Sequence, residues 1–409
     1  MTTRSYVLSS GPLRSPGFAA LWVAQVASRF GDPITLVALA YVSYVQTRSA
    51  LVTALAVVIA TIPNALFGLF GGAIADAIGH RRAMIACDFG RVLFVGAVPV
   101  VLALGFPLVA AYILVFAAAV CGAIFNPARM ALLPRIVTRD SLPAANSLIY
   151  SSDRAVEVLG AVAAGLLVAS IGDRAFYVDA VTFLVSGIAL LRIQVEEEAR
   201  PLALVSIARE ALEGVRFLWS HAVLRANTVL SLACQLSIPV VSSLMPSLMI
   251  RRFAGGNPEL GASLFGLAEA AIAIGAVVGG IYFGTRLSRL PKGRLIIAGF
   301  AIYGLVLVGI ALAPTFELAV LLFAIGGVAN VVFYVPNVTL SQELAPPELR
   351  ARVFGARIAL LNLSWLPLIV LSGALADVVG VTVLIAVAGA VTLVSAVVGA
   401  FIPILRDVP

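Results

Sequence analysis

The chain has 409 residues, of which 61% are hydrophobic and only 11% are charged. A soluble protein of this length needs more charge to cover its surface, and apolar runs long enough to cross a bilayer recur along the whole chain. These values exclude a soluble globular protein and indicate a polytopic α-helical membrane protein. Its net charge of +7 is then explained by basic residues in cytoplasmic loops, and no nucleic-acid partner is expected.

Twelve apolar segments predict twelve transmembrane helices, at residues 17–46, 50–75, 83–104, 108–127, 144–171, 175–193, 223–250, 261–286, 293–313, 316–340, 351–377 and 380–404. Of the 27 lysines and arginines, 18 lie in one set of loops and ends and four lie in the other. The positive-inside rule places the richer set in the cytoplasm. We therefore expect both termini in the cytoplasm and a multi-pass location in the inner (plasma) membrane.

The first span carries Arg29 and Asp32 about one helical turn apart. A charge inside a span is costly, so these two residues either pair to tolerate each other or serve transport. In the second case Asp32 binds a proton or a substrate cation and leaves Arg29 when the cavity changes sides. The run Gly31-Asp32-Pro33 predicts a local break or kink, and unwound backbone there favours a binding site.

Span five carries Asp153, Arg154 and Glu157. Asp153 and Glu157 lie four residues apart on one helix face, so desolvation and mutual repulsion favour uptake of a proton by one of them. The alternative is an ion pair with Arg154, or with Arg129 of span four. Glu269 of span eight has no basic residue within a turn or two, so it must protonate, find a partner across a cavity, or face water.

The connector 194–222 has apolar residues at helical spacing with charges between them, which predicts an amphipathic helix along the membrane surface. It is either a plain linker or a regulatory or partner-binding element. The predicted domains are a six-helix bundle at 1–193, this cytoplasmic linker, and a second six-helix bundle at 223–409.

The two halves are related by an internal repeat. Gly71-Gly72 recurs 208 residues later as Gly279-Gly280, and Pro127 recurs 209 residues later as Pro336. Such repeats build a central cavity with alternating access in many secondary transporters. The predicted fold is therefore an all-α membrane protein with twelve transmembrane helices in two six-helix pseudo-repeats around a central cavity.

The pattern Gly72-x-x-x-Asp76-x-x-Gly79-x-Arg81-Arg82 resembles the loop 2–3 signature of the major facilitator superfamily. Further stretches resemble the branch of that family with enterobactin-type exporters and macrolide-efflux proteins: FAALWVAQVASRFGD (18–32), FNPARMALLP (125–134), LPAANSL (142–148), AFYVDAVTFLVSG (175–187) and LRARVFGA (349–356). The resemblance covers essentially the whole chain. It also favours a structural hydrogen-bonding role for Asp179 of span six.

The resemblance implies a cytoplasmic gate in which Asp76 meets the start of span eleven. The basic residues near that start are Arg350, Arg352 and Arg357. Their guanidinium groups and the positive helix end would outweigh the repulsion between Asp76 and the end of its own helix. The contact would favour an outward-open state, with Arg81 and Arg82 as further partners. His80 stands where the signature usually has a basic residue, so we expect a looser gate.

Together these features predict a secondary active exporter, a proton antiporter for a small amphipathic compound such as a drug, siderophore or secondary metabolite. The alternatives are a lipid or lysolipid flippase or importer of the same fold, or a non-transporting membrane sensor. No phosphate-loop motif and no catalytic cluster is present, and the cysteines lack C-x-x-C spacing, so no enzyme activity, metal or cofactor is expected. The expected partners are substrate, protons and the lipid bilayer, with the protein as a monomer.

Overall fold

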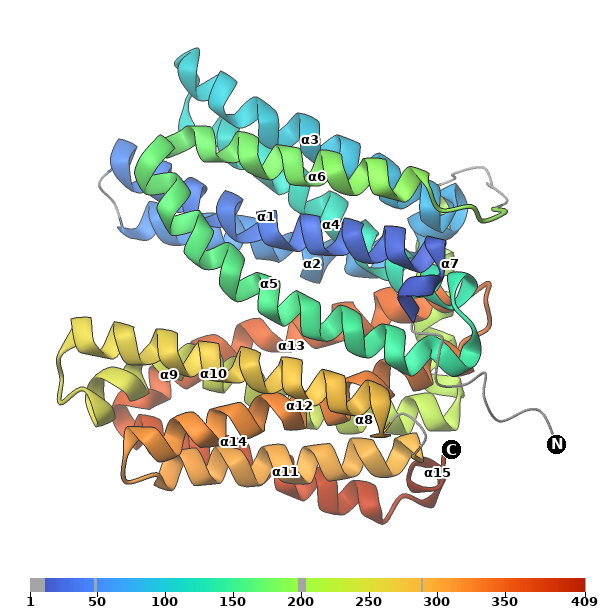
Figure 1. Ribbon diagram of the computed structural model, residues 1–409, viewed down its shortest axis with the longest axis vertical. Coiled ribbons are helices and arrows are strands. Elements are labelled where there is room, and N and C mark those ends of the chain that lie inside the picture. The colour runs from blue at the N-terminus through green and yellow to red at the C-terminus, as the bar shows by residue number, and fades with distance from the viewer. Residues whose placement is uncertain (1–11, 48–49, 198–203, 288–289, 409) are drawn as a thin grey trace. The chain divides into compact units, whose positions relative to one another are not determined.

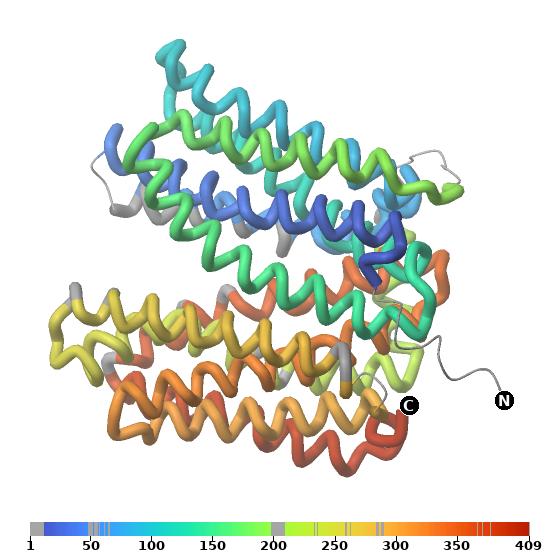
Figure 2. Tube along the Cα trace, viewed as in Figure 1, coloured from blue at the N-terminus to red at the C-terminus, as the bar shows by residue number. Residues whose placement is uncertain are grey.

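The computed structural model describes residues 12–47, 50–197, 204–287 and 290–408, and within these ranges the chain is helical with no strand (Figures 1 and 2). Residues 1–11, which include the predicted cytoplasmic N-terminus, and residues 198–203 of the predicted linker lie outside the described residues. The helices of the N-terminal half are α1 (Pro16–Thr47), α2 (Ala50–Ile78), α3 (His80–Ala103), α4 (Leu108–Ile136), α5 (Leu142–Ile171) and α6 (Ala175–Leu191), with short turns η1 (Pro12–Arg14), η2 (Arg139–Ser141) and η3 (Gly172–Arg174).

The connector contains α7 (Leu204–Ser220), as its amphipathic pattern predicted. The helices that follow are α8 (Ala222–Gln235), α9 (Ser237–Leu248), η4 (Met249–Phe253), α10 (Pro258–Thr285), α11 (Lys292–Leu312), α12 (Phe316–Leu344), α13 (Arg350–Val379), α14 (Val381–Ala400) and α15 (Pro403–Arg406). Each predicted span falls on a helix, the seventh on α8, α9 and η4 together. Nine segments of the described chain are long and apolar enough to cross a membrane. The count of twelve spans and the twofold repeat stay predictions.

One expectation about α1 is wrong: Gly31-Asp32-Pro33 does not break the helix, which runs without interruption from Pro16 to Thr47. Pro33 lacks the N–H that would bond the carbonyl four residues earlier. That loss is a single bond in a 32-residue helix, and α1 packs against α6 and α2. Asp32 therefore lies on regular helix, without the unwound backbone that the sequence suggested.

Glycine determines where α2 ends. Gly79 is the single residue between α2 and α3, and its φ of 96° lies in the region that residues with a Cβ rarely adopt. Gly380 has a φ of 94° and separates α13 from α14 in the same way. These turns let one long helix follow another after one residue.

The described chain divides into two compact units. The first takes residues within 1–145, 156–217 and 345–360, and the second takes residues within 146–155, 218–344 and 361–409. A short part of α5 thus belongs to the second unit, and the start of α13 belongs to the first. The domain boundaries predicted at 193 and 222 stay predictions.

In the first unit α1 packs against α6, and α3 packs against α4 and α6 (Figure 1). The buried core between them includes Ile34 and Leu39 of α1, Val95 of α3, and Phe176 and Phe183 of α6. Since lipid tails are as apolar as these side chains, close packing and hydrogen bonds between helices hold such a bundle together. The polar contacts of α6 described below belong to the same interface.

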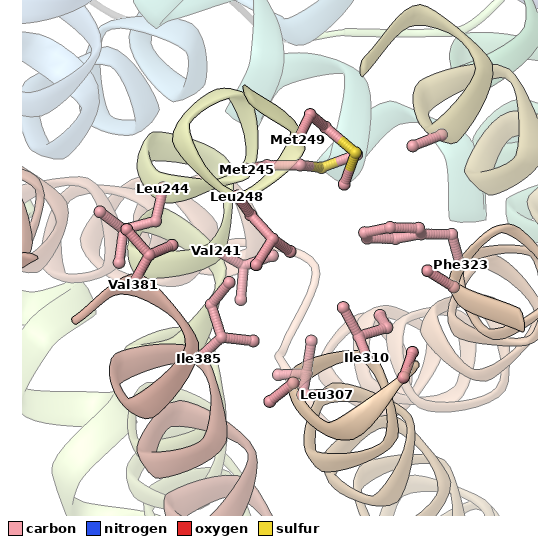
Figure 3. Packing of buried hydrophobic residues seen from close by; sticks show 14 of the residues in the cluster. Val241, Leu244, Met245, Leu248, Met249, Leu307, Ile310, Phe323, Val381 and Ile385 are labelled. Carbon is pink, nitrogen blue, oxygen red and sulfur yellow. The ribbon is translucent and has the colours of Figure 1, made fainter. Parts of the chain in front are cut away.

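In the second unit α11 packs against α12 and α14, and α10 packs against α12. Figure 3 shows an apolar cluster of this unit, with side chains from α9, η4, α11, α12 and α14 that include Val241, Leu244, Met245, Leu248, Met249, Leu307, Ile310, Phe323, Val381 and Ile385. Gly275 of α10 and Gly327 of α12 let these two helices touch, because a Cβ on either would overlap backbone of the other. Small residues at a helix contact are typical of membrane bundles.

Candidate functional site

The contact predicted between Asp76 and the start of span eleven is present within the first unit, and the group of residues around it is called the gate. Arg352, in the first turn of α13, lies with its Nε 2.8 Å from Oδ2 of Asp76, near the end of α2. Both side chains are 8% exposed. A Cβ on Gly72 would overlap the backbone of Ala351, so glycine at this position lets α2 approach α13 closely enough for the ion pair to form.

Arg352 also binds two carboxylates of the connector helix α7. Its Nη2 lies 2.7 Å from Oε2 of Glu210, and its Nη1 lies 2.8 Å from Oε2 of Glu213. Each of the three guanidinium nitrogens therefore faces a different carboxylate, a geometry that a lysine ammonium cannot reproduce. A Cβ on Gly214 would approach the Arg352 backbone to 2.6 Å, so α7 also lies in close contact with α13 here.

His80 completes the surroundings of Asp76. Its Nε2 lies 2.9 Å from Oδ1 of Asp76, and its Nδ1 lies 3.8 Å from Oε1 of Glu197. Each oxygen of the buried Asp76 carboxylate thus has its own partner, Arg352 on one and His80 on the other. The sequence suggested that His80 loosens the gate, whereas the structure gives it a direct contact to Asp76.

Arg81 and Arg82 make their hydrogen bonds at the start of α3 and the end of α6, and not with Asp76 as expected. The Arg81 guanidinium donates to the carbonyls of Leu190 and Leu191, at 3.2 and 2.8 Å, where α6 ends. The backbone N–H groups of Arg81 and Arg82 donate to the carboxylate of Glu197. A cation on the last carbonyls of α6 and an anion on the first N–H groups of α3 both match the helix dipoles.

Of the three arginines expected near Asp76, the structure shows Arg352 in contact with the Asp76 carboxylate. Arg350 donates from its Nε to the carbonyl of Ala345 at 3.1 Å, in the turn that precedes α13. Arg357 is buried further along α13. Asp76 therefore binds the guanidinium that points back from the first turn of the helix.

On α1, Arg29 and Asp32 form the expected pair, with Nη1 and Oδ2 3.4 Å apart. The side chains are 37% and 43% exposed, so the pair lies on an accessible part of the helix. The distance is long for an ion pair, which leaves Asp32 less tightly held than Asp76.

A second group of charges lies on α3 and α6, and the sequence reasoning missed most of it. Asp88 is fully buried; its Oδ2 accepts a hydrogen bond from Ser186, and its Oδ1 lies 4.0 Å from Nη1 of Arg91. Asp179 is also fully buried, and its carboxyl oxygens lie within hydrogen-bonding distance of the hydroxyl groups of Thr35 and Thr182. The hydrogen-bonding role predicted for Asp179 agrees with these contacts. Asp88 and Arg91 had a signal in the sequence, the same i,i+3 spacing that singled out Arg29 and Asp32.

The remaining candidates are spread over both units. Arg129 is buried on α4, and Glu157 is exposed on the part of α5 in the first unit. In the second unit Asp153 and Glu269 are half-buried, and the guanidinium of Arg154 lies 5.5 Å from the centre of the Tyr150 ring. Their place in proton coupling stays a prediction.

Small polar residues of α5 form hydrogen bonds with α10 and α12 within residues 146–155, the part of α5 that belongs to the second unit. Asn146 donates to Thr339 and Gln342 of α12, at 2.9 and 2.6 Å. The hydroxyl of Ser151 donates to the carbonyl of Ala276 of α10 at 3.1 Å. Sequence reasoning had no signal for these contacts, because asparagine and serine at such positions occur in many helices.

Long apolar helices that carry buried ionisable side chains are typical of multi-pass membrane transporters. A family model described as the Major Facilitator Superfamily matches residues 21–366 and, in a second match, residues 256–409. The chain belongs to this family.

Two curated relatives resemble the chain over most of its length. The multidrug efflux pump Tap of Mycolicibacterium fortuitum is 30% identical over 414 residues, which cover 97% of this chain and 97% of the relative. Macrolide efflux protein A of Streptococcus pyogenes is 24% identical over 396 residues, which cover 89% of this chain and 90% of the relative. The similarity to efflux transporters agrees with the branch suggested by the sequence motifs.

Among solved structures, that of the human organic anion transporter MFSD10 superimposes with a TM-score of 0.74 at 13% identity. The match covers 95% of this chain and 100% of the other. At this identity the likeness shows the fold alone.

Proposed function

We propose that the protein is a secondary exporter of small amphipathic compounds, driven by proton antiport and working by alternating access in the inner membrane. The observation that carries the proposal is the similarity to the multidrug efflux pump Tap, which extends over 97% of both chains. Similarity over the whole length supports a shared mode of transport better than a match to one segment, because the transport pathway is built from helices of both halves.

The gate supports an alternating-access cycle. Asp76 is buried in an ion pair with Arg352 at the end of α2, and such a pair is costly to break unless a new arrangement satisfies its charges. A contact of this kind holds one state of a carrier until substrate or proton binding offsets its loss. With the cytoplasmic ends assigned by the positive-inside rule, the gate stabilises the outward-open state.

Proton coupling is proposed to use acidic residues inside the helices. Asp32 is suited to the role because it is accessible and its pair with Arg29 is long. Glu269 of the second unit is half-buried in an apolar stretch of α10 and is the candidate there. Asp153, Glu157 and Arg129 are the further candidates of α5 and α4.

A transport assay with purified protein in liposomes tests the function. Radiolabelled erythromycin, a macrolide, is the first probe, and its movement is measured with and without an imposed pH gradient. We expect flux that follows the proton gradient and moves the macrolide against its own gradient. Macrolide flux that ignores the pH gradient would refute proton coupling. Movement of a fluorescent lysolipid, without flux of any drug in a panel, would favour a flippase.

Asp32→Asn and Glu269→Gln are each expected to abolish the gradient-driven part of the flux, because both remove a protonatable group while preserving side-chain shape. Asp140→Asn is the matched control, since Asp140 lies exposed on η2 and is not among the proposed coupling residues. Size-exclusion profiles equal to wild type show that the variants are folded. Wild-type efflux in both variants would remove the two residues from the coupling mechanism.

A further inference from the structure

One face of α6 carries a row of polar side chains toward α1 and α3. Asp179, Thr182 and Ser186 are spaced i, i+3 and i+7, so they lie on the same side of the helix. Asp179 meets Thr35 of α1, and Ser186 meets Asp88 of α3. The two buried carboxylates thus lie about 10 Å apart along the axis of α6.

Two of the charged groups around this row are fully buried carboxylates. The charged groups on α6 and on the elements packed against it are Arg29 and Asp32 of α1, His80, Arg81, Arg82, Asp88 and Arg91 of α3, Asp173 and Arg174 of η3, and Asp179 itself. Of these, Asp88 and Asp179 are the fully buried carboxylates. An ionised carboxylate at such a place needs a cation beside it.

The two buried carboxylates differ in their distance to a cation. Arg29 lies 3.4 Å from Asp32, and Arg91 lies 4.0 Å from Asp88. Within the described residues no lysine, arginine or histidine nitrogen lies within 4.0 Å of the Asp179 carboxylate. An ionised carboxylate that is fully buried without a cation is strongly disfavoured, and such a group takes up a proton.

The hydrogen bonds of Asp179 fit a protonated carboxyl. The hydroxyl of Thr182 lies 2.7 Å from the backbone carbonyl of Asp179 and 3.0 Å from its Oδ1. A hydroxyl has one proton to donate. When that proton goes to the nearer carbonyl, the contact with Oδ1 is satisfied if Oδ1 carries a proton and donates to the threonine oxygen.

Asp32 provides a route by which this proton can leave. Gly31, its neighbour on α1, packs directly against the Asp179 carboxylate, where any Cβ would overlap it. Asp32 is also 43% exposed, whereas Asp179 is fully buried.

We propose that Asp179 is a proton-binding site of this carrier: it holds a proton on Oδ1 in the structure described and exchanges it with water through the carboxylate of Asp32. On release the Oδ1–H bond breaks, Asp32 accepts the proton, and Asp179 remains as the carboxylate. The role in the transport cycle rests on the proposed proton antiport, whereas the protonation of Asp179 does not.

Infrared spectroscopy of the purified full-length protein in nanodiscs tests protonation without any substrate. At neutral pH we expect a C=O stretching band of a protonated carboxyl that shifts in D₂O and is lost in Asp179→Asn. Asp76→Asn is the matched control, because it removes a carboxylate of similar burial that has an arginine at 2.8 Å, and the band is expected to remain. Loss of the band in Asp88→Asn and its retention in Asp179→Asn would overturn the proposal.

Thr35→Val keeps the test valid if Asp179→Asn does not fold. Removing the hydroxyl that contacts Oδ2 is expected to shift the same band to higher frequency without loss of intensity. An unshifted band would assign the proton to another carboxyl and overturn the proposal.

Transport measurements distinguish a failure of this inference from a failure of the proposed function. Macrolide flux in liposomes driven by a pH gradient is expected to be lost in Asp179→Asn, while macrolide exchange at equal pH continues. Proton-driven flux unchanged in Asp179→Asn would overturn the proposed role of Asp179 and leave the antiporter intact. The protein could instead show a carboxyl band that depends on Asp179 and yet move the macrolide without response to pH. That result would refute proton antiport but would still support the protonation of Asp179.

Discussion

Arg352 is the residue on which the gate depends. Its three guanidinium nitrogens face carboxylates of Asp76, Glu210 and Glu213, all at 2.7–2.8 Å. Three acids around one buried base leave an excess of negative charge, so removal of the base exposes each acid to the repulsion of the others. The gate is therefore more sensitive to loss of Arg352 than to loss of any single acid.

Arg352→Gln is expected to lower the free energy of unfolding by about 3 kcal/mol, the lower end of the range for breaking a buried ion pair, because Glu210 and Glu213 are partly exposed. The measurement is the midpoint of thermal unfolding in detergent. Combining it with Glu210→Gln and Glu213→Gln should recover part of the loss by removing the repelling charges. A triple variant less stable than Arg352→Gln alone would contradict this explanation.

At the scale of elements, glycines in both helices allow α2 and α13 to pack closely. The ion pair between Asp76 and Arg352 is short because Gly72 lets the backbone of Ala351 approach. Gly355 of α13 does the same from the opposite side, where a Cβ would lie 2.6 Å from the carbonyl of Gly68. Helix contact and ion pair are thus parts of one interface.

Gly72→Ala is expected to destabilise the protein by about 1–3 kcal/mol, because the new methyl group overlaps backbone that cannot move without separating the helices. Gly165→Ala in α5 is the matched control: its Cβ meets nothing within 4 Å, and the alanine should raise stability by about 0.4–1 kcal/mol through helix propensity. Thermal unfolding of both variants checks the pair. Equal stability of the two would argue against close packing at Gly72.

Helix positions were predictable from the sequence, and helix partners were not. A segment that crosses lipid must be apolar and long, so α3, α11 and α14 begin and end within a few residues of the predicted spans. No such rule says which side chains meet across helices. Asp76 was recognised by its motif, but Glu210 and Glu213 looked like the solvated face of a linker. The break predicted at Pro33 is absent, because the loss of one hydrogen bond does not interrupt a 32-residue helix that packs against α6 and α2.

At the scale of the whole molecule, the proposed cycle requires the gate to form and break once per turnover. The start of α13 belongs to the first unit together with Asp76, while the rest of the helix belongs to the second. The gate therefore acts on an element that takes part in both units. A weaker gate is expected to change how often the carrier switches more than how well it binds.

Asp76→Asn should lower the maximal rate of macrolide transport while the KM stays near that of wild type, because the change removes a charge from the gate and none from the proposed coupling residues. Initial rates in liposomes over a range of macrolide concentrations separate the two quantities. A raised KM with an unchanged maximal rate would assign Asp76 to substrate binding instead.

The three acids around Arg352 differ in their access to dissolved ions. Asp76 is 8% exposed and thus largely shielded, whereas Glu213 is 41% exposed and within reach of counterions. At physiological ionic strength the screening length is about 8 Å, and it shortens as salt rises. Rising salt is therefore expected to weaken the contact of α7 with α13 before it affects the pairing of α2 with α13, so the ionic strength around this end of the helices affects how firmly the connector is held.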